Sequence, residues 1–112
     1  MTAAALLAAG SAAAASSLTP QDIKATFGTG KPFAATSSGG QVYTFVLKPD
    51  GSATQAPKGS NTTIVTGTWR VNDKGYCSKW GTNAEHCYLV EKNGARYDVR
   101  DGTGQVISHW AP

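Results

Sequence analysis

Hydrophobic and polar side chains alternate with a period of two residues along much of the chain, which is the pattern of half-buried β-strands. In residues 41–48 the large side chains Phe45 and Leu47 share one face. In residues 62–71 Trp69 occupies the corresponding apolar face. β-Branched and aromatic residues dominate both stretches, and we therefore expect each of them to form a strand.

Turn sequences separate further strands of the same kind. Pro49–Ser52 and Asn72–Gly75 place Asp, Asn and Gly where turns favour them, and Asn93-Gly94 is a strong two-residue hairpin signal. Residues 31–40 are polar and predict a loop. The predicted strands are 41–48, 53–56, 62–71, 76–80, 86–92, 95–100 and 105–110. The fold class is therefore mainly β, with about seven short strands in an antiparallel meander that curls into a barrel or folds into a sandwich to hide its edges.

One short helix is predicted near the N-terminus, within residues 16–27. Thr19 is suited to the N-cap, Pro20 to the first helical position and Asp22 to the first turn. Ile23 and Phe27 lie four residues apart and share one face. We expect about two turns of helix that cover the β core as a lid or plug.

Gly67 interrupts the second strong strand. A glycine inside a strand marks a bend, a bulge or a place where a bulky ring lies across the backbone. Trp69, two residues further on the same face, is a natural anchor for the core.

Residues 1–15 are uncharged and rich in Ala and Leu. They are too short to span a bilayer as a helix, and Ala13-Ala14-Ala15 fits the A-x-A cleavage rule of a secretory signal peptide. A complete signal peptide begins with Lys or Arg, which this segment lacks, so the signal is interpreted as truncated at its N-terminus. We expect one exported domain, residues 16–112, in the periplasm or secreted, with no stable membrane insertion after cleavage.

Two cysteines, Cys77 and Cys87, are the only ones in the chain. In an exported protein such a pair usually forms a disulfide, and a loop this short contributes about 2.5–3 kcal/mol in the chain-entropy account. No C-x-x-C motif is present, so a metal or redox role is disfavoured.

Charge and composition limit the partners. The net charge is +3 and the basic residues are spread singly along the chain. Nucleic-acid binding needs clustered basic charge, so it is not expected. A monomer or a weak dimer is the expected state.

Known catalytic motifs give little support for an enzyme. His86 and His109, with Glu85 or Asp98, could form a metal site or an acid–base pair, but their spacing matches no ligand motif. The Asp-Gly segments at Asp50 and Asp101 lack the acidic spacing of calcium loops and are interpreted as turns. We therefore expect no metal, no cofactor and no catalytic residues.

Aromatic residues are numerous for so short a chain, and most of them must form the core. Those exposed at a barrel mouth would suit stacking on a sugar ring or an apolar ligand. Tyr76 and Trp80 flank the cysteines and are the ones we expect to be exposed. The full set of candidate ligand-binding residues is Trp69, Tyr76, Lys79, Trp80, Arg96 and Tyr97.

Short motifs along the chain resemble a family of small bacterial exported proteins, domain-of-unknown-function family 995. The matching residues are Leu18-Thr19 with Ile23, Tyr43 with Asp50-Gly51, Gly67-x-Trp69, Tyr76-Cys77-x-x-Trp80, Cys87 and Tyr97. The resemblance implies an exported β domain without an assigned activity. The Gly67-x-Trp69 motif also resembles the barrel-closing motif of lipocalins and other calycins, which carry it on the first strand.

Together these features predict a non-enzymatic exported domain that binds a small apolar or sugar-like ligand. One alternative is an inhibitor or accessory protein that presents a loop, residues 78–86, to a secreted enzyme or an envelope protein. An enzyme is the second alternative. A cavity lined by Trp and Tyr would favour the ligand, and a packed barrel with an exposed apolar loop would favour the protein partner.

Overall fold

The computed structural model describes residues 16–60 and 62–112, and the predicted signal peptide lies outside them. Its elements are β1 (Ser16–Ser17), α2 (Pro20–Thr26), β2 (Phe33–Ser37), β3 (Val42–Leu47), β4 (Ser52–Pro57), β5 (Val65–Asn72), β6 (Gly75–Trp80), β7 (His86–Asn93), β8 (Arg96–Arg100) and β9 (Val106–Ala111).

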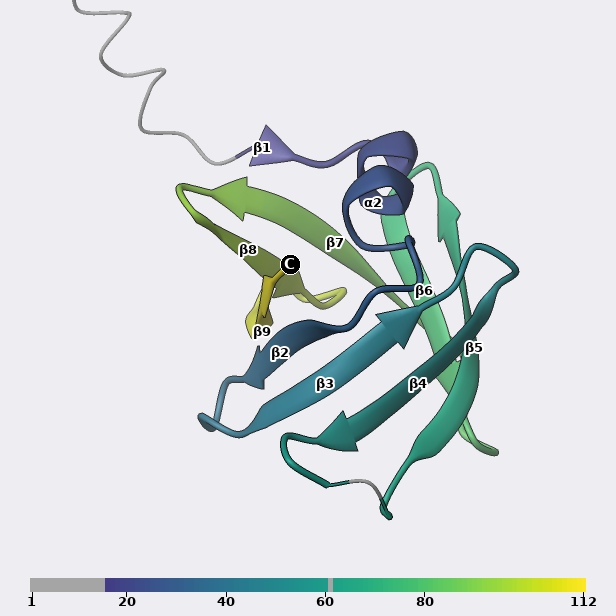
Figure 1. Cartoon of the computed structure of the whole chain (residues 1–112). Helices are drawn as coiled ribbons and strands as arrows, with labels where there is room; N and C mark the ends of the chain where they lie inside the picture. The colour runs from purple at the N-terminus through teal and green to yellow at the C-terminus, as the bar shows by residue number, and fades with distance from the viewer. Residues whose placement is uncertain (1–15, 61) are drawn as a thin grey trace, which may run out of the picture.

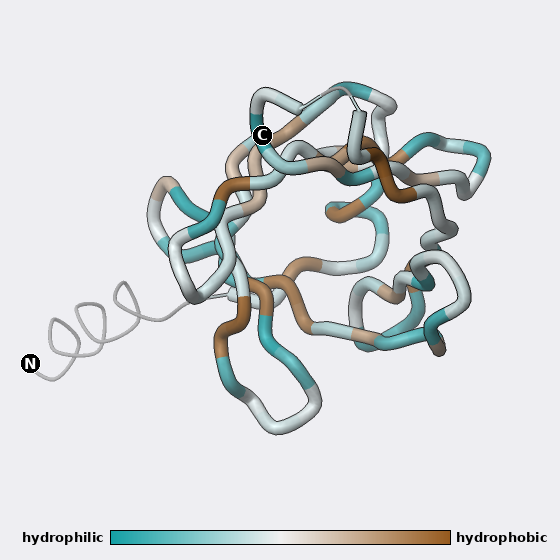
Figure 2. The backbone as a smooth tube through the Cα atoms, turned by 90° about the horizontal axis from the view of Figure 1, so that it is seen from below, coloured by the Kyte–Doolittle hydropathy of each residue, from teal (hydrophilic) through white to brown (hydrophobic). Residues whose placement is uncertain are grey.

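Eight strands form a closed antiparallel barrel (Figure 1). Each strand from β2 to β9 pairs with the next, and the register pair Ala35–Trp110 belongs to the β2–β9 pairing that closes the ring. Seen along the barrel from below, the chain runs around a continuous ring (Figure 2). The mainly β prediction is confirmed, and of the two expected architectures the barrel is the one that forms.

The strand count is higher than the sequence predicted. Residues 31–40 were expected to be a loop, but Phe33–Ser37 form β2 and bond to both β3 and β9. The small and polar residues of β2 have a low strand propensity. The strand forms because its backbone hydrogen bonds join the free edges of β3 and β9. β1 is a short addition that pairs with β7 through Ser16 and Ser17.

α2 closes one end of the barrel, at the top in Figure 1, as predicted. Thr19 and Asp22 form a reciprocal capping box, and Pro20 begins the helix. Ile23 is fully buried, and the Phe27 ring packs edge-on against Trp110 with centroids 4.9 Å apart. The helix therefore plugs this end with its apolar face.

The up-and-down order of the strands assigns every connection to one of two ends. The turns at residues 48–51, 73–74 and 94–95 lie at the α2 end, because successive antiparallel strands reverse direction. The connections at 38–41, 58–60 with 62–64, 81–85 and 101–105 lie at the opposite end, which we call the open end. Asp50 and Asp101 serve as turn residues, since each accepts backbone N–H groups two residues ahead.

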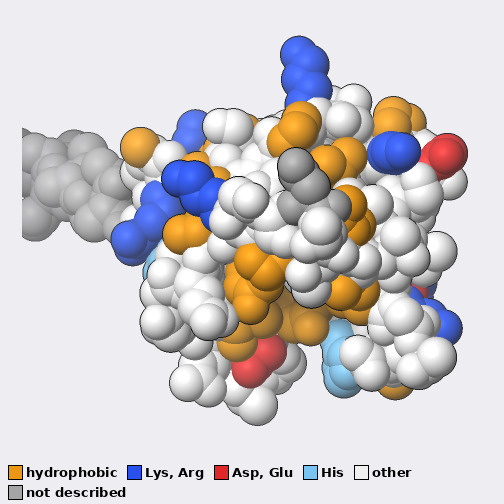
Figure 3. Space-filling model, turned by 60° about the horizontal axis from the view of Figure 1, so that its bottom comes forward, with side chains coloured by type: hydrophobic (Ala, Val, Ile, Leu, Met, Phe, Trp, Pro, Cys, Tyr) orange, Lys and Arg blue, Asp and Glu red, His pale blue; other side chains and the backbone are white. Residues whose placement is uncertain are grey.

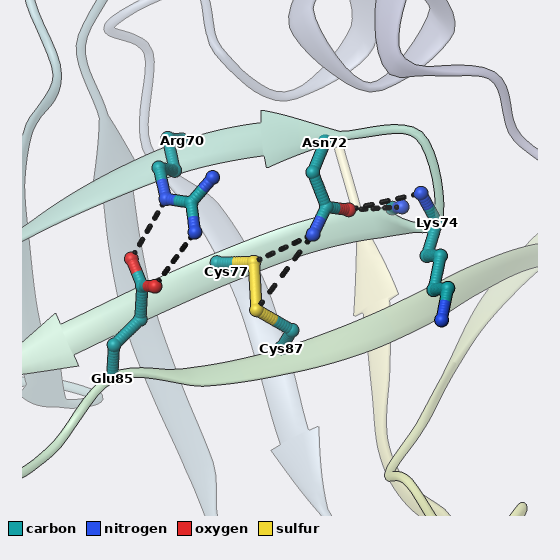
Figure 4. The surroundings of a disulfide bond; sticks show 7 residues. Arg70, Asn72, Lys74, Cys77, Glu85 and Cys87 are labelled. Atoms are coloured by element: carbon teal, nitrogen blue, oxygen red, sulfur yellow. Dashed lines mark hydrogen bonds and ion pairs between the residues drawn. A yellow bond between two sulfur atoms is a disulfide. The ribbon is translucent and has the colours of Figure 1, made fainter.

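The disulfide is formed as predicted. Cys77 in β6 and Cys87 in β7 lie directly opposite each other and are bonded at 2.04 Å. The Asn72 side-chain amide donates to both sulfurs, while its carbonyl oxygen accepts the backbone N–H groups of Lys74 and Gly75 (Figure 4). The side chain of Asn72 thereby links the β5–β6 turn to the cross-link.

Gly67 confirms the expectation of a close approach. A methyl group built there would clash with the Lys79 carbonyl oxygen and would meet the Trp80 ring at 2.8 Å. The indole of Trp80 thus lies across the backbone of β5, where only a hydrogen leaves room for it.

Replacing Gly67 with Ala is expected to lower the free energy of unfolding by about 1–3 kcal/mol, because the added methyl overpacks against backbone. Gly102→Ala is the matched control, since a Cβ there meets nothing within 4 Å. Urea unfolding followed by circular dichroism measures both. Equal stabilities of the two variants would contradict the close packing at Gly67.

Removing the disulfide with the double variant Cys77→Ser, Cys87→Ser is expected to lower the free energy of unfolding by about 2.5–3 kcal/mol, because it releases a constraint on the unfolded chain. The comparison is urea unfolding with and without a reductant. The wild type should lose this stability in reductant and the double variant should not respond. A wild type insensitive to complete reduction would refute the assigned contribution.

Candidate functional site

A cavity of ≈ 210 Å³ penetrates the barrel toward its open end. Its lining comes from strands β3, β4 and β6 to β9. The lining residues are Phe45, Gln55, Tyr76, Ser78, Trp80, Tyr88, Val99, Ile107, Ser108 and Trp110. The space-filling view from this side shows hydrophobic side chains gathered in a recess (Figure 3).

β6 supplies three neighbouring members of this lining. Alternation along the strand turns Tyr76, Ser78 and Trp80 toward the interior and Cys77 and Lys79 toward the outside. β6 therefore carries the cavity lining on its inner face and the disulfide on its other face, where Cys77 is itself covered and fully buried.

The most buried lining residues form the floor of the cavity. Tyr76, Val99 and Trp110 are each 2% exposed, and Ser78 is 3% exposed. Tyr76 stacks on Tyr88 with centroids 5.9 Å apart and meets Trp110 edge-on at 4.9 Å. These rings fix one another, so the floor is preformed and largely aromatic.

The polar groups of the floor are unequally satisfied. The indole N–H of Trp80 donates to the Ser78 hydroxyl at 3.1 Å. The Tyr76 hydroxyl is buried and has no hydrogen-bond partner in the part of the chain that the structure describes. Burial raises the pKa of Tyr76 well above its ordinary value, and the nearby Ser78 hydroxyl offsets this only in part. Tyr76 therefore remains a neutral donor.

The lining carries no charged side chain. An ion placed there would lose its hydration without gaining a partner of opposite charge, which is costly. The cavity is consequently suited to a neutral molecule.

The predicted ligand-binding residues divide among three places. Tyr76 and Trp80 line the cavity, although Tyr76 was expected to be exposed and is buried. Trp69 lies at the α2 end, where its indole N–H donates to the Lys48 carbonyl oxygen. Tyr97 packs edge-on against Phe27 at the same end, at 5.0 Å. Lys79 and Arg96 are exposed and are not among the lining residues.

Sequence reasoning missed most of the lining. The inward positions of β7 and β9, which include Tyr88, Ser108 and Trp110, follow from the same alternation that identified Trp80. Alternation does not show how far along the barrel axis a side chain lies. Trp69 and Trp80 therefore look equivalent in the sequence, although Trp69 lies toward the α2 end and Trp80 toward the open end.

A second polar cluster surrounds Asp98 on the outer wall. Asp98 is only 4% exposed because His109, Asn93 and Arg96 cover it. Its carboxylate lies 2.7 Å from His109 Nδ1, 3.1 Å from Asn93 Nδ2 and 3.3 Å from the Arg96 guanidinium. The pair of His109 with Asp98 is one that the sequence suggested, and neither residue lines the cavity.

The electrostatics of Asp98 favour its charged form. Burial acts to raise its pKa, but hydrogen bonds with Asn93 and His109 and the charge of Arg96 outweigh burial and lower the pKa below its ordinary value. The cluster therefore holds a carboxylate against the barrel wall, where it joins β8 to β9.

Two further observations concern metal and membrane. Among the described residues, the one group with metal-ligand geometry is Cys77, Glu85 and Cys87, and its two sulfurs are already bonded to each other. Glu85 instead forms a bidentate ion pair with Arg70, at 2.8 Å and 2.9 Å (Figure 4). Within residues 16–60 and 62–112, α2 falls far short of the length and apolar character needed to cross a bilayer.

Comparison of the chain with protein-family models, with curated proteins and with solved structures found no match.

Replacing Asp98 with Asn is expected to lower the free energy of unfolding by about 1–3 kcal/mol at pH 7, because His109 and Arg96 lose a charged acceptor. The folded-state pKa of Asp98 is depressed, so its contribution is present above the unfolded pKa of about 3.9 and is lost as the pH falls through the folded pKa. The difference between wild type and variant should therefore shrink below about pH 4.

The measurement is urea unfolding of wild type and Asp98→Asn from pH 3 to pH 7. Asp73→Asn, in the exposed β5–β6 turn, serves as the control and should change stability by less than about 0.5 kcal/mol. A difference that stays constant over the whole pH range would show that the carboxylate charge is not the source of the effect.

Proposed function

We propose that this protein is an exported, non-enzymatic binding domain that holds one small, neutral, mainly apolar molecule in the open-end cavity. The observation that carries the proposal is the cavity itself, with a floor of aromatic rings and a few polar groups that converge on it. Small-molecule sites in proteins commonly combine a mainly apolar concave wall with a small number of placed polar groups.

The dimensions support a single small occupant. An eight-stranded barrel is just wide enough to be filled by side chains or to hold one small ligand. Here α2 and the side chains beneath it fill one end, and ≈ 210 Å³ is left at the other. Cavities of about 150 Å³ hold a benzene ring, so a molecule of one or two fused rings is the appropriate size.

Export is the second part of the proposal. The disulfide between Cys77 and Cys87 supports it, because disulfides persist in oxidising compartments such as the periplasm and the extracellular space.

An inhibitor or accessory protein is the second candidate function. It is favoured by the exposed large hydrophobic residues Ile64 and Val65, at 54% and 41%, beside the β4–β5 connection at the open end. The cavity favours the ligand-binding function over the inhibitor function. A barrel that only presents a loop does not need an unfilled aromatic interior, because protein interiors are normally close-packed.

The test is a titration with indole, a neutral molecule of two fused rings, followed by amide chemical shifts of isotope-labelled protein. We expect saturable shifts that cluster on the strands that line the cavity. Ser108→Phe, which places a ring in the cavity, should weaken binding at least about tenfold because it occupies the same space. Lys79→Ala, on the outer face of β6, should leave the affinity unchanged.

Shifts confined to Ile64, Val65 and their neighbours, or no saturable binding by any small neutral aromatic compound, would overturn the proposed function. Equal affinity of wild type and Ser108→Phe would place the site elsewhere on the molecule.

A further inference from the structure

The Tyr76 hydroxyl stands out from the rest of the interior. It is the one side-chain polar atom in the described chain that is buried without a hydrogen-bond partner. Other buried polar groups are satisfied: Trp69 donates to a carbonyl oxygen, and Asp98 has three polar neighbours. A buried donor without a partner destabilises the folded state, so it calls for an explanation.

The position of Tyr76 points to a ligand. Tyr76 belongs to the floor of the cavity. Ser78 and Trp80 follow it on the same face of β6, and the indole N–H of Trp80 already donates to the Ser78 hydroxyl. The same Ser78 hydroxyl is the polar group that interacts with the Tyr76 side chain. The Tyr76 hydroxyl itself is covered, so a molecule that fills the cavity to its floor reaches this unpartnered donor only when a lining side chain shifts.

We propose that the Tyr76 hydroxyl selects the ligand: the cavity takes a neutral aromatic molecule whose carbonyl oxygen accepts a hydrogen bond from Tyr76. This deepens the proposed function and rests on it. Tyr88, Phe45 and Trp110 supply aromatic surfaces around the space, which favour a flat ring over a flexible chain.

The required acceptor follows from the donor inventory. A tyrosine hydroxyl that stays protonated offers one O–H, and no charged group lines the cavity to balance an anionic oxygen. A neutral carbonyl satisfies the hydroxyl without bringing an unpaired charge into the barrel. A hydrocarbon of the same shape leaves the hydroxyl unsatisfied, so it should bind more weakly.

The experiment uses two probes of nearly equal shape, acetophenone and α-methylstyrene, which differ in a C=O group against a C=CH₂ group. Isothermal titration and amide chemical shifts measure both affinities for the full chain. Wild type is expected to bind acetophenone about tenfold more tightly. Tyr76→Phe, which removes only the hydroxyl, should abolish this preference while keeping the affinity for α-methylstyrene.

Tyr43→Phe is the matched control. The Tyr43 hydroxyl donates to Gln41 Oε1 and does not belong to the cavity lining, so its loss should leave the preference at about tenfold. Thermal unfolding without a probe is a second readout. Tyr76→Phe should be as stable as wild type or more stable, because it removes an unsatisfied buried group.

Each outcome decides between the two proposals. If both probes bind the cavity with equal affinity in wild type, or if Tyr76→Phe keeps the preference, the role of Tyr76 is overturned and the proposed binding function stands. If neither acetophenone nor α-methylstyrene nor indole binds, the proposed function fails and the selectivity fails with it.

Discussion

Backbone hydrogen bonding between β2 and β9 joins the two ends of the meander, and the rest of the structure depends on it. Without this pairing the sheet would have two free edges and one hydrophobic face open to water. With it, every second side chain from all eight strands points into a common interior. The aromatic cluster, the plug formed by α2 and the open-end cavity all exist because the ring is closed.

Much of the fold could be predicted from local sequence. Alternation located the strands from β3 to β9, turn residues located their connections, and the capping residues Thr19 and Asp22 located the helix. β2 could not be found in this way, because Ala and Ser carry little strand propensity and its position is fixed by partners distant in sequence. The disulfide was predicted from the single pair of cysteines and the expected export, and it forms between directly opposite residues of β6 and β7.

The candidate site was less accessible to sequence reasoning. Tyr76 and Trp80 were expected to be exposed because they flank the cysteines, but both line the interior and Tyr76 is buried. Trp69 and Tyr97 carry the same residue types and belong to the packing under α2. Only the pairing of strands shows how far along the barrel axis each ring lies. That position decides whether a ring packs in the core under α2 or lines the cavity.

The plug formed by α2 has a consequence for kinetics. A pore open at both ends would let a molecule pass through, whereas a cup sealed at its base forces arrival and departure through a single mouth. For the proposed ligand, the connections around that mouth, at residues 38–41, 58–60, 62–64, 81–85 and 101–105, would govern residence time, while the rings at the base would govern how strongly it is held. Substitutions in those connections should thus alter the speed of exchange separately from its equilibrium.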